Sequence, residues 1–259
     1  MPYFIFILSL IASIIGAISG IGGGIIIKPV LDATHTLNIT AISLLTGCTV
    51  LAMSAVSIAR NIRGSITMNL KTSTLLGIGA VIGGILGKEL FDKLIQISTI
   101  NKVGAIQSLI LFIITIIIFI YIRFQRNIVT KKITNPLTTG LIGGSLGVTS
   151  TFLGIGGGPL NIAILYYFFS MTGKTAVLNS LYVIFISQLA GLLGMFMDHN
   201  IPQIDPITLL TMILGGIIGA LIGYRMNKNF NDEQVEQYFC IVVGCSAFLN
   251  VWNFFHYLQ

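Results

Sequence analysis

The sequence predicts an all-α polytopic membrane protein with about eight transmembrane helices in two homologous four-span repeats, each containing a glycine-rich helix break. Three observations predict this class. The 259 residues are 54% hydrophobic and only 8% charged, which leaves too little polar surface to cover a soluble globule. About two-thirds of the chain lies in apolar runs of the length that a membrane span requires. The pentapeptide at residues 20–24, Gly-Ile-Gly-Gly-Gly, recurs unchanged at residues 154–158, which indicates an internal duplication.

The first repeat is expected to cover residues 1–122 and to begin directly with a span. The segment from about Tyr3 to the first glycine cluster has no basic leader and no small-residue cleavage site, so we interpret it as a span and not as a signal peptide. The chain then passes through Lys28 and Pro29 to a polar corner at 32–38. Further spans are predicted at about 40–59, 70–87 and 103–121, with a short amphipathic surface segment at 89–95.

The second repeat is expected to cover residues 137–259, after a polar linker at 123–136. Its spans are predicted at about 137–153, 176–197, 207–223 and 238–255. Four spans per half would make the repeats parallel, unless each broken segment re-enters on its own side. In the eight-span topology the Lys and Arg residues divide seven against seven between the two sets of loops, so the positive-inside rule does not orient the chain.

The duplication extends to a ladder of glycines in the third span of each half. At an offset of about 136 residues, Gly79, Gly83 and Gly87 correspond to Gly215, Gly219 and Gly223, and the neighbouring Thr72 and Ile82 correspond to Thr208 and Ile218. Glycines four residues apart lie on one helix face and allow two helix backbones to approach closely. We therefore expect the ladders to serve packing, with the functional residues elsewhere.

The two glycine clusters are the best candidates for a binding site. Irregular backbone at membrane depth is tolerated only inside protein or beside a water-filled cavity, and paired breaks indicate a central substrate site. Freed amides and the positive end of the following helix favour an anion. The alternative is that each cluster only allows helices to cross closely. The predicted backbone contacts are those of Gly22, Gly23, Gly24, Gly156, Gly157 and Gly158.

Lys28 is the most informative single side chain of the candidate site. It follows three isoleucines, and a cation at membrane depth is costly unless it has a function, here as countercharge to the anion. The alternative is a lysine that extends from a span end to water, since Asp32 and Thr34 follow. Every carboxylate is expected at a span end or corner, so no buried acid is predicted as a proton relay. The uncharged polar residues that could complete the cavity are Ser43, Thr46, Asn161, Asn179, Ser180 and Gln188.

Other classes of function find little support. The basic residues are scattered at span ends, which suits lipid headgroups better than nucleic acid. Cys48, Cys240 and Cys245 lie in apolar runs without metal-ligand spacing, and we expect them to be buried. We predict no cofactor, no metal and no enzymatic activity, because the three histidines lie at span ends. An intramembrane enzyme and a non-transporting membrane subunit or assembly partner remain as alternatives, and a homo-oligomer stays open.

Over essentially its whole length the chain resembles the sulfite exporter TauE/SafE family of membrane transporters. The resemblance rests on the doubled Gly-x-Gly-Gly-Gly and on Pro29-Val30-Leu31, which keeps the family's Pro-x-Leu. The chain departs from the family at Lys28, where an apolar residue is usual, and at Ala163, where a proline is usual. The resemblance implies export or exchange of a small anion, typically sulfite or an organosulfonate such as sulfoacetate, across the bacterial inner membrane.

Overall fold

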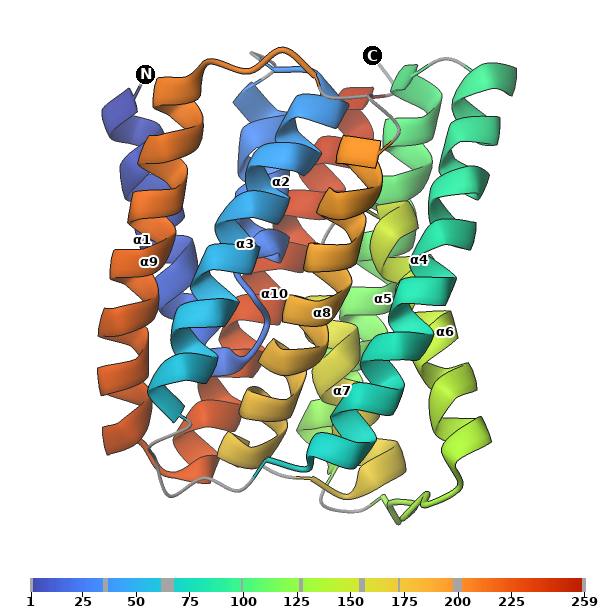
Figure 1. The fold of residues 1–259 in the computed structure, drawn as a ribbon, viewed down its shortest axis with the longest axis vertical. Coiled ribbons are helices and arrows are strands. Elements are labelled where there is room, and N and C mark those ends of the chain that lie inside the picture. The colour runs from blue at the N-terminus through green and yellow to red at the C-terminus, as the bar shows by residue number, and fades with distance from the viewer. Residues whose placement is uncertain are drawn as a thin grey trace.

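The computed structural model describes residues 2–34, 37–61, 68–98, 100–125, 128–153, 157–171, 173–197 and 202–257. Within these ranges the chain forms ten α-helices and no β-strand (Figure 1). The helices are α1 (Pro2–Ser19), α2 (Gly24–Thr34), α3 (Ile39–Asn61), α4 (Leu70–Ile97), α5 (Ile100–Phe124), α6 (Pro136–Leu153), α7 (Gly158–Phe169), α8 (Gly173–Met197), α9 (Pro206–Asn229) and α10 (Asp232–Tyr257).

Six of these helices are long and apolar enough to cross a membrane, namely α3, α4, α5, α8, α9 and α10. The predicted count of eight spans is therefore not confirmed. The two remaining predicted spans correspond to α1 and α6, which are followed by the short helices α2 and α7. The predicted helix breaks are present, because α1 ends at Ser19 before the first glycine cluster and α6 ends at Leu153 before the second.

The first glycine cluster turns the chain back along α1. Gly20, Gly22 and Gly23 have φ values of +75°, +84° and +72°, a region that side-chain-bearing residues rarely adopt. The reversal brings the Gly23 backbone against Gly16, where a methyl group would clash with it, and against the Ala12 carbonyl. In Figure 1, α1 begins at the top of the molecule and α2 returns to that side. We call this pair of helices hairpin 1.

The second glycine cluster belongs to a corresponding hairpin that enters from the opposite side. We call α6 and α7 hairpin 2. The N–H groups of Lys131 and Ile133, in the segment before α6, donate to the carbonyls of Tyr167 and Phe168 at the end of α7, at 2.7 and 3.0 Å. The end of α7 therefore returns to the side on which α6 begins, at the bottom of Figure 1. The expectation of parallel repeats does not hold, because helices α1–α5 and helices α6–α10 run in opposite directions through the molecule. The duplication itself stays a prediction.

The glycine ladders pack helices from opposite halves of the chain against each other. On α4, a methyl group at Gly83 would clash with the Gly144 carbonyl of α6, and one at Gly79 with the Gly140 carbonyl. On α9, Gly219 and Gly223 lie in the same way against Leu10 and Ile14 of α1. The packing role predicted for the ladders is confirmed. It joins α4 of the first half to hairpin 2, and α9 of the second half to hairpin 1.

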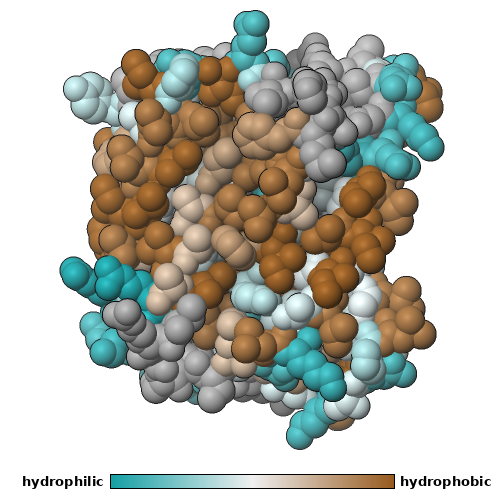
Figure 2. Space-filling model, in the orientation of Figure 1, coloured by the Kyte–Doolittle hydropathy of each residue, from teal (hydrophilic) through white to brown (hydrophobic). Residues whose placement is uncertain are grey.

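The observed topology changes the charge balance between the two sides. Among the described Lys and Arg residues, three lie at the side where α1 begins: Lys88, Lys93 and Lys102. Eight lie at the opposite side: Arg60, Lys71, Arg123, Lys131, Lys132, Lys174, Arg225 and Lys228. The predicted even division is wrong because it assumed that the hairpins cross the membrane. Figure 2 shows hydrophilic residues toward both ends of the molecule and apolar residues between them.

Three smaller expectations also change. Residues 89–95 are not a separate surface segment, because α4 continues unbroken to Ile97. The predicted linker is shorter than expected, since α5 extends to Phe124. The cysteines are not fully buried: Cys48 and Cys240 are partly exposed, and Cys245 is exposed on α10.

Candidate functional site

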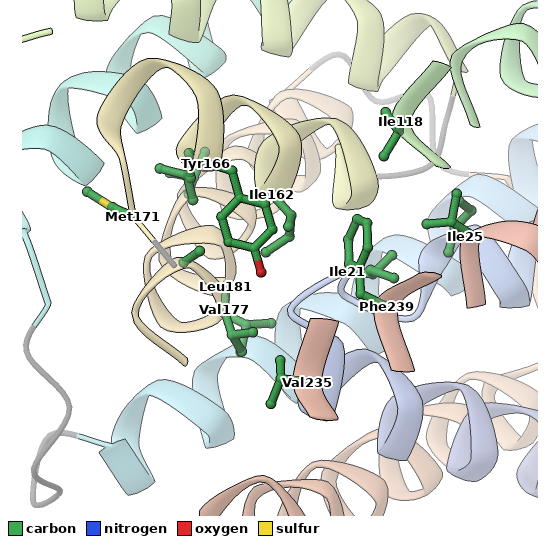
Figure 3. Packing of buried hydrophobic residues seen from close by; sticks show 14 of the residues in the cluster. Ile21, Ile25, Ile118, Ile162, Tyr166, Met171, Val177, Leu181, Val235 and Phe239 are labelled. Atoms are coloured by element: carbon green, nitrogen blue, oxygen red, sulfur yellow. The ribbon is translucent and has the colours of Figure 1, made fainter. Parts of the chain in front are cut away.

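The tips of the two hairpins meet inside the helix bundle. Ile21, at the tip of hairpin 1, lies so close to Gly158 at the start of α7 that a methyl group on this glycine would clash with the Ile21 carbonyl oxygen. Ile21 is fully buried and belongs to the main core cluster. Other members of the cluster that surround the tips are Ile25, Ile162, Val177 and Phe239 (Figure 3). The N-termini of α2 and α7, which carry partial positive charge, therefore begin in the same buried region.

The second break offers more polar groups than the first. Gly157 caps α7 in the left-handed conformation, with φ +84°, and its carbonyl accepts the Asn161 N–H at 3.0 Å. A methyl group at Gly157 would lie 2.6 Å from Ser150 Oγ and 3.0 Å from Asn161 Oδ1. Asn161 is 3% exposed, and its Oδ1 has no hydrogen-bond partner among the described residues.

A small cavity adjoins this break between α5, α6 and α7. Its lining includes Thr115, Thr149, Ser150 and Gly157, together with leucine, isoleucine and proline side chains. The Thr115 and Thr149 hydroxyls donate to carbonyls of their own helices. Of the hydroxyls in this lining, Ser150 Oγ lies nearest to Gly157.

Lys28 places a buried amino group beside the second break. Its side chain extends from α2 and is 2% exposed, and Nζ donates to the Leu153 carbonyl at 2.6 Å and to Gln107 Oε1 at 3.3 Å. Gln107 Nε2 donates to the Phe152 carbonyl at 2.6 Å. The two side chains thus satisfy the last two carbonyls of α6, which a helix C-terminus leaves without intrahelical partners. The alternative of a lysine that extends to water is wrong, because the ammonium points into the protein.

The first break is filled by packing. The Ser180 hydroxyl donates to the Gly20 carbonyl at 2.7 Å, and Gly20 lies against Val177 and Ile162. Gly22 contacts Val50 and Ile184, and Gly23 contacts Ala12. At the start of α2, the Gly23 carbonyl accepts the N–H groups of Ile26 and Ile27, while the first-turn amides that precede them have no helical acceptor. The two breaks therefore differ in their surroundings: hydrophobic side chains and the Ser180 hydroxyl surround the first, whereas Ser150 and Asn161 lie beside the second. A small cavity also lies on the side of hairpin 1, where Ala17, Ser57 and Val177 line it.

The other predicted side chains are distributed around the tips. Asn179 is fully buried and links α8 to α4, since its Oδ1 accepts from Asn69 N–H and Ser73 Oγ at 3.0 and 2.6 Å. Thr46 is buried, and its hydroxyl has no hydrogen-bond partner among the described residues. Ser43 and Gln188 are half-buried, and Gln188 Oε1 faces Gly47. Gly156 lies outside the described residues. Substrate contacts by any of these residues stay predictions.

Two residues near Lys28 were missed or misplaced by sequence reasoning. Gln107 is 4% exposed and was not selected, although an amide in an apolar run is the same signal that drew attention to Gln188. Asp32 was placed in a polar corner, but it lies on α2 and is only 9% exposed. The expectation that no acid is buried is therefore wrong for Asp32, although it lies near the end of α2. Among the described residues, no group of three or more His, Cys, Asp or Glu side chains could hold a metal ion.

Comparison with known proteins agrees with this architecture. The model of the sulfite exporter TauE/SafE family matches residues 5–249. The chain belongs to this family. It is also similar to the probable membrane transporter protein YunE of Bacillus subtilis (strain 168), with 22% identity over 266 residues that cover 92% of this chain and 94% of the relative. No solved structure matches this chain. This TauE/SafE protein is thus a multi-pass membrane transporter and not an enzyme.

Proposed function

We propose that this protein carries a small sulfur-containing oxyanion, sulfite or an organosulfonate, across the cell's inner membrane by export or exchange. The observation that carries the proposal is the meeting of two helix N-termini, from hairpins of opposite direction, beside the buried Lys28 ammonium. Helix N-termini and a desolvated cation together favour a negative charge, and no other described lysine or arginine is buried.

The anion would bind at the second break, against the α7 N-terminus. Gly157 and Gly158 would supply backbone contacts, Ser150 and Asn161 would supply side-chain hydrogen bonds, and Lys28 would supply the countercharge. Glycine is required here because the break needs φ +84° at Gly157 and close approach to Ile21 at Gly158. The name of the family supports the choice of sulfite as the first substrate to test.

Two inverted repeats would supply alternating access. Residues 1–122 and 137–259 would form the repeats, joined by 123–136, and movement of one against the other would open the site to each side in turn. The glycine ladders support this arrangement, because α4 of the first half packs against hairpin 2 and α9 of the second half packs against hairpin 1. The excess of basic residues opposite the α1 N-terminus supports a cytoplasmic location for that basic side.

The experiment is flux of ³⁵S-sulfite in proteoliposomes with the purified protein, using sulfate, thiosulfate, sulfoacetate and chloride as competitors. We expect saturable flux that a sulfur oxyanion inhibits and chloride does not. Gly157→Leu should abolish flux while Gly140→Leu, on an open face of α6, should keep it. Absence of sulfite flux and of inhibition by any sulfur oxyanion, for folded wild-type protein, would overturn the proposed substrate class.

A further inference from the structure

The feature that the proposed site does not use is a buried carboxylate next to Lys28. Asp32 follows Lys28 by four residues on α2, so the two side chains lie on the same helix face. They are 9% and 2% exposed. The Asp32 carboxylate is the charged group that acts electrostatically on the Lys28 ammonium. Opposite charges in a low-dielectric region are tolerated when they balance each other.

Among the described residues, few other ionisable groups lie on the helices packed against this pair, and His35 lies outside that part of the chain. The helices α1 and α7 contain no Asp, Glu, Lys, Arg or His, and α3 contains only Arg60, in its last turn at the opposite side. From α10, the Tyr257 hydroxyl interacts electrostatically with Asp32, and His256 precedes it on the exposed part of the helix. From α5, the neutral amide of Gln107 binds Lys28. In the anion-free protein, Lys28 and Asp32 therefore bring a net charge of zero into this region.

We propose that Asp32 is a proton-binding site coupled to the anion that Lys28 attracts. This inference rests on the proposed function. A monovalent anion beside Lys28 changes the local net charge from zero to minus one and a divalent anion changes it to minus two, and a buried negative charge without a countercharge is strongly disfavoured. Proton uptake by the Asp32 carboxylate restores neutrality with a monovalent anion and halves the excess charge with a divalent one. Only the O–H bond of the carboxyl group forms on anion binding, and it breaks again, with release of the proton to water, when the anion leaves.

The coupling makes the protein a proton–anion symporter. One proton moves with each anion in the same direction, so transport of a monovalent anion is electroneutral. The proposed cycle requires Lys28 to keep its proton: burial disfavours the ammonium, whereas the Asp32 carboxylate and the acceptors at Leu153 and Gln107 favour it. Asp32 acts on the anion through Lys28 and is thus a coupling residue that does not itself contact the anion.

The test is calorimetric titration of the purified full-length protein with thiosulfate and with sulfite in two buffers of different ionisation enthalpy. Thiosulfate is fully ionised at neutral pH and brings no proton of its own. Wild-type protein should take up about one proton per thiosulfate bound, because binding and protonation are linked. Asp32→Asn should bind thiosulfate without proton uptake, and Asp32→Glu should restore the uptake. Asp205→Asn, which changes an exposed acid on the same side, is the matched control and should behave as wild type.

The outcomes separate this inference from the proposed function. Anion binding by wild-type protein without proton uptake, or equal uptake by Asp32→Asn, overturns the coupling and leaves the anion carrier standing. Failure of both anions to bind wild-type protein overturns the proposed function together with the coupling. The double variant Lys28→Met/Asp32→Asn removes both charges at once. It should elute as folded protein in size-exclusion chromatography but bind neither anion, whereas anion binding by this variant would show that the pair is not part of the site.

Discussion

The cross-half glycine contacts predict a large difference between two neighbouring substitutions on one helix. Gly147 of α6 packs against the Ala80 backbone of α4, and a methyl group there would lie 2.7 Å from the Ala80 carbonyl carbon and Cα. Non-bonded carbon atoms prefer about 3.5–4 Å, so the two helices would have to separate by roughly 1 Å. At Gly140, two turns earlier on the same helix, no atom lies within 4 Å of such a methyl group.

The matched pair isolates the packing contribution. Both changes to alanine raise helix propensity by a similar amount, about 0.5–1 kcal/mol, which cancels in the comparison. The remaining difference is the cost of overpacking, about 1–3 kcal/mol. Gly147→Ala should therefore unfold more readily than Gly140→Ala, by roughly 5- to 150-fold in the equilibrium constant. The hydrophobic effect does not contribute to this difference in unfolding free energy, because lipid tails are as apolar as the helix surface.

The assay is reversible unfolding of the purified protein in mixed micelles by titration with a denaturing detergent, followed by circular dichroism. Equal free energies of unfolding for the two variants, or a more stable Gly147→Ala, would refute the close contact between α4 and α6. Since this contact joins the two halves of the chain, its loss would also remove the main support for their exchange of hairpins.

Three further predictions follow from particular residues. Gln107→Leu leaves the Phe152 carbonyl unsatisfied, so the free energy of unfolding should fall by about 1–3 kcal/mol in the same titration, and an unchanged value would contradict the capping role of Gln107. Hydrogen bonds from the Thr208 side chain and from backbone amides hold the pKa of Asp205, the N-cap of α9, below its ordinary value. The stabilisation that the carboxylate provides is thus fully present above the unfolded-state pKa and is lost as pH falls through the folded-state pKa. The difference in unfolding free energy between wild type and Asp205→Ala should therefore shrink over that pH range. A difference that grows would exclude the capping role of Asp205. The C-terminal end of α10 lies opposite the basic side, so the proposed orientation places it outside the cytoplasm. Alkaline phosphatase fused after residue 259 should therefore be active, and a fluorescent protein fused there should be dark. The reverse pattern would invert the proposed orientation.

Sequence reasoning located the breaks but could not determine the path of the chain through them. The doubled glycine clusters suffice to end a helix, and both α1 and α6 end there, whereas Pro29 and Pro159 lie within the helices that follow. Whether the next segment continues or returns depends on contacts such as that of Gly23 with Gly16, which hydropathy does not contain. The unconfirmed count of eight spans and the even charge division both follow from that one missing fact.

The candidate site was predicted in part for a similar reason. Lys28 was identified because a cation within an apolar run is unusual, but its partners, Gln107 and the Leu153 carbonyl, lie 79 and 125 residues away in sequence. Asp32 looked solvated because polar residues follow it, whereas the packing of α10 against α2 contributes to its burial. The two breaks differ in their polar groups, because the Ser180 hydroxyl satisfies the Gly20 carbonyl at the first, whereas Asn161 Oδ1 at the second has no hydrogen-bond partner among the described residues.

The most direct test of the binding site is anomalous diffraction from crystals of the protein with selenite, the selenium analogue of sulfite. The account predicts a single strong selenium peak at the second break, within hydrogen-bonding distance of Lys28 Nζ or of the Gly157 and Gly158 backbone. The peak should disappear in Lys28→Met. A peak only at another location, such as the basic end of α9, or none at saturating selenite, would contradict the claim that the hairpin tips hold the anion.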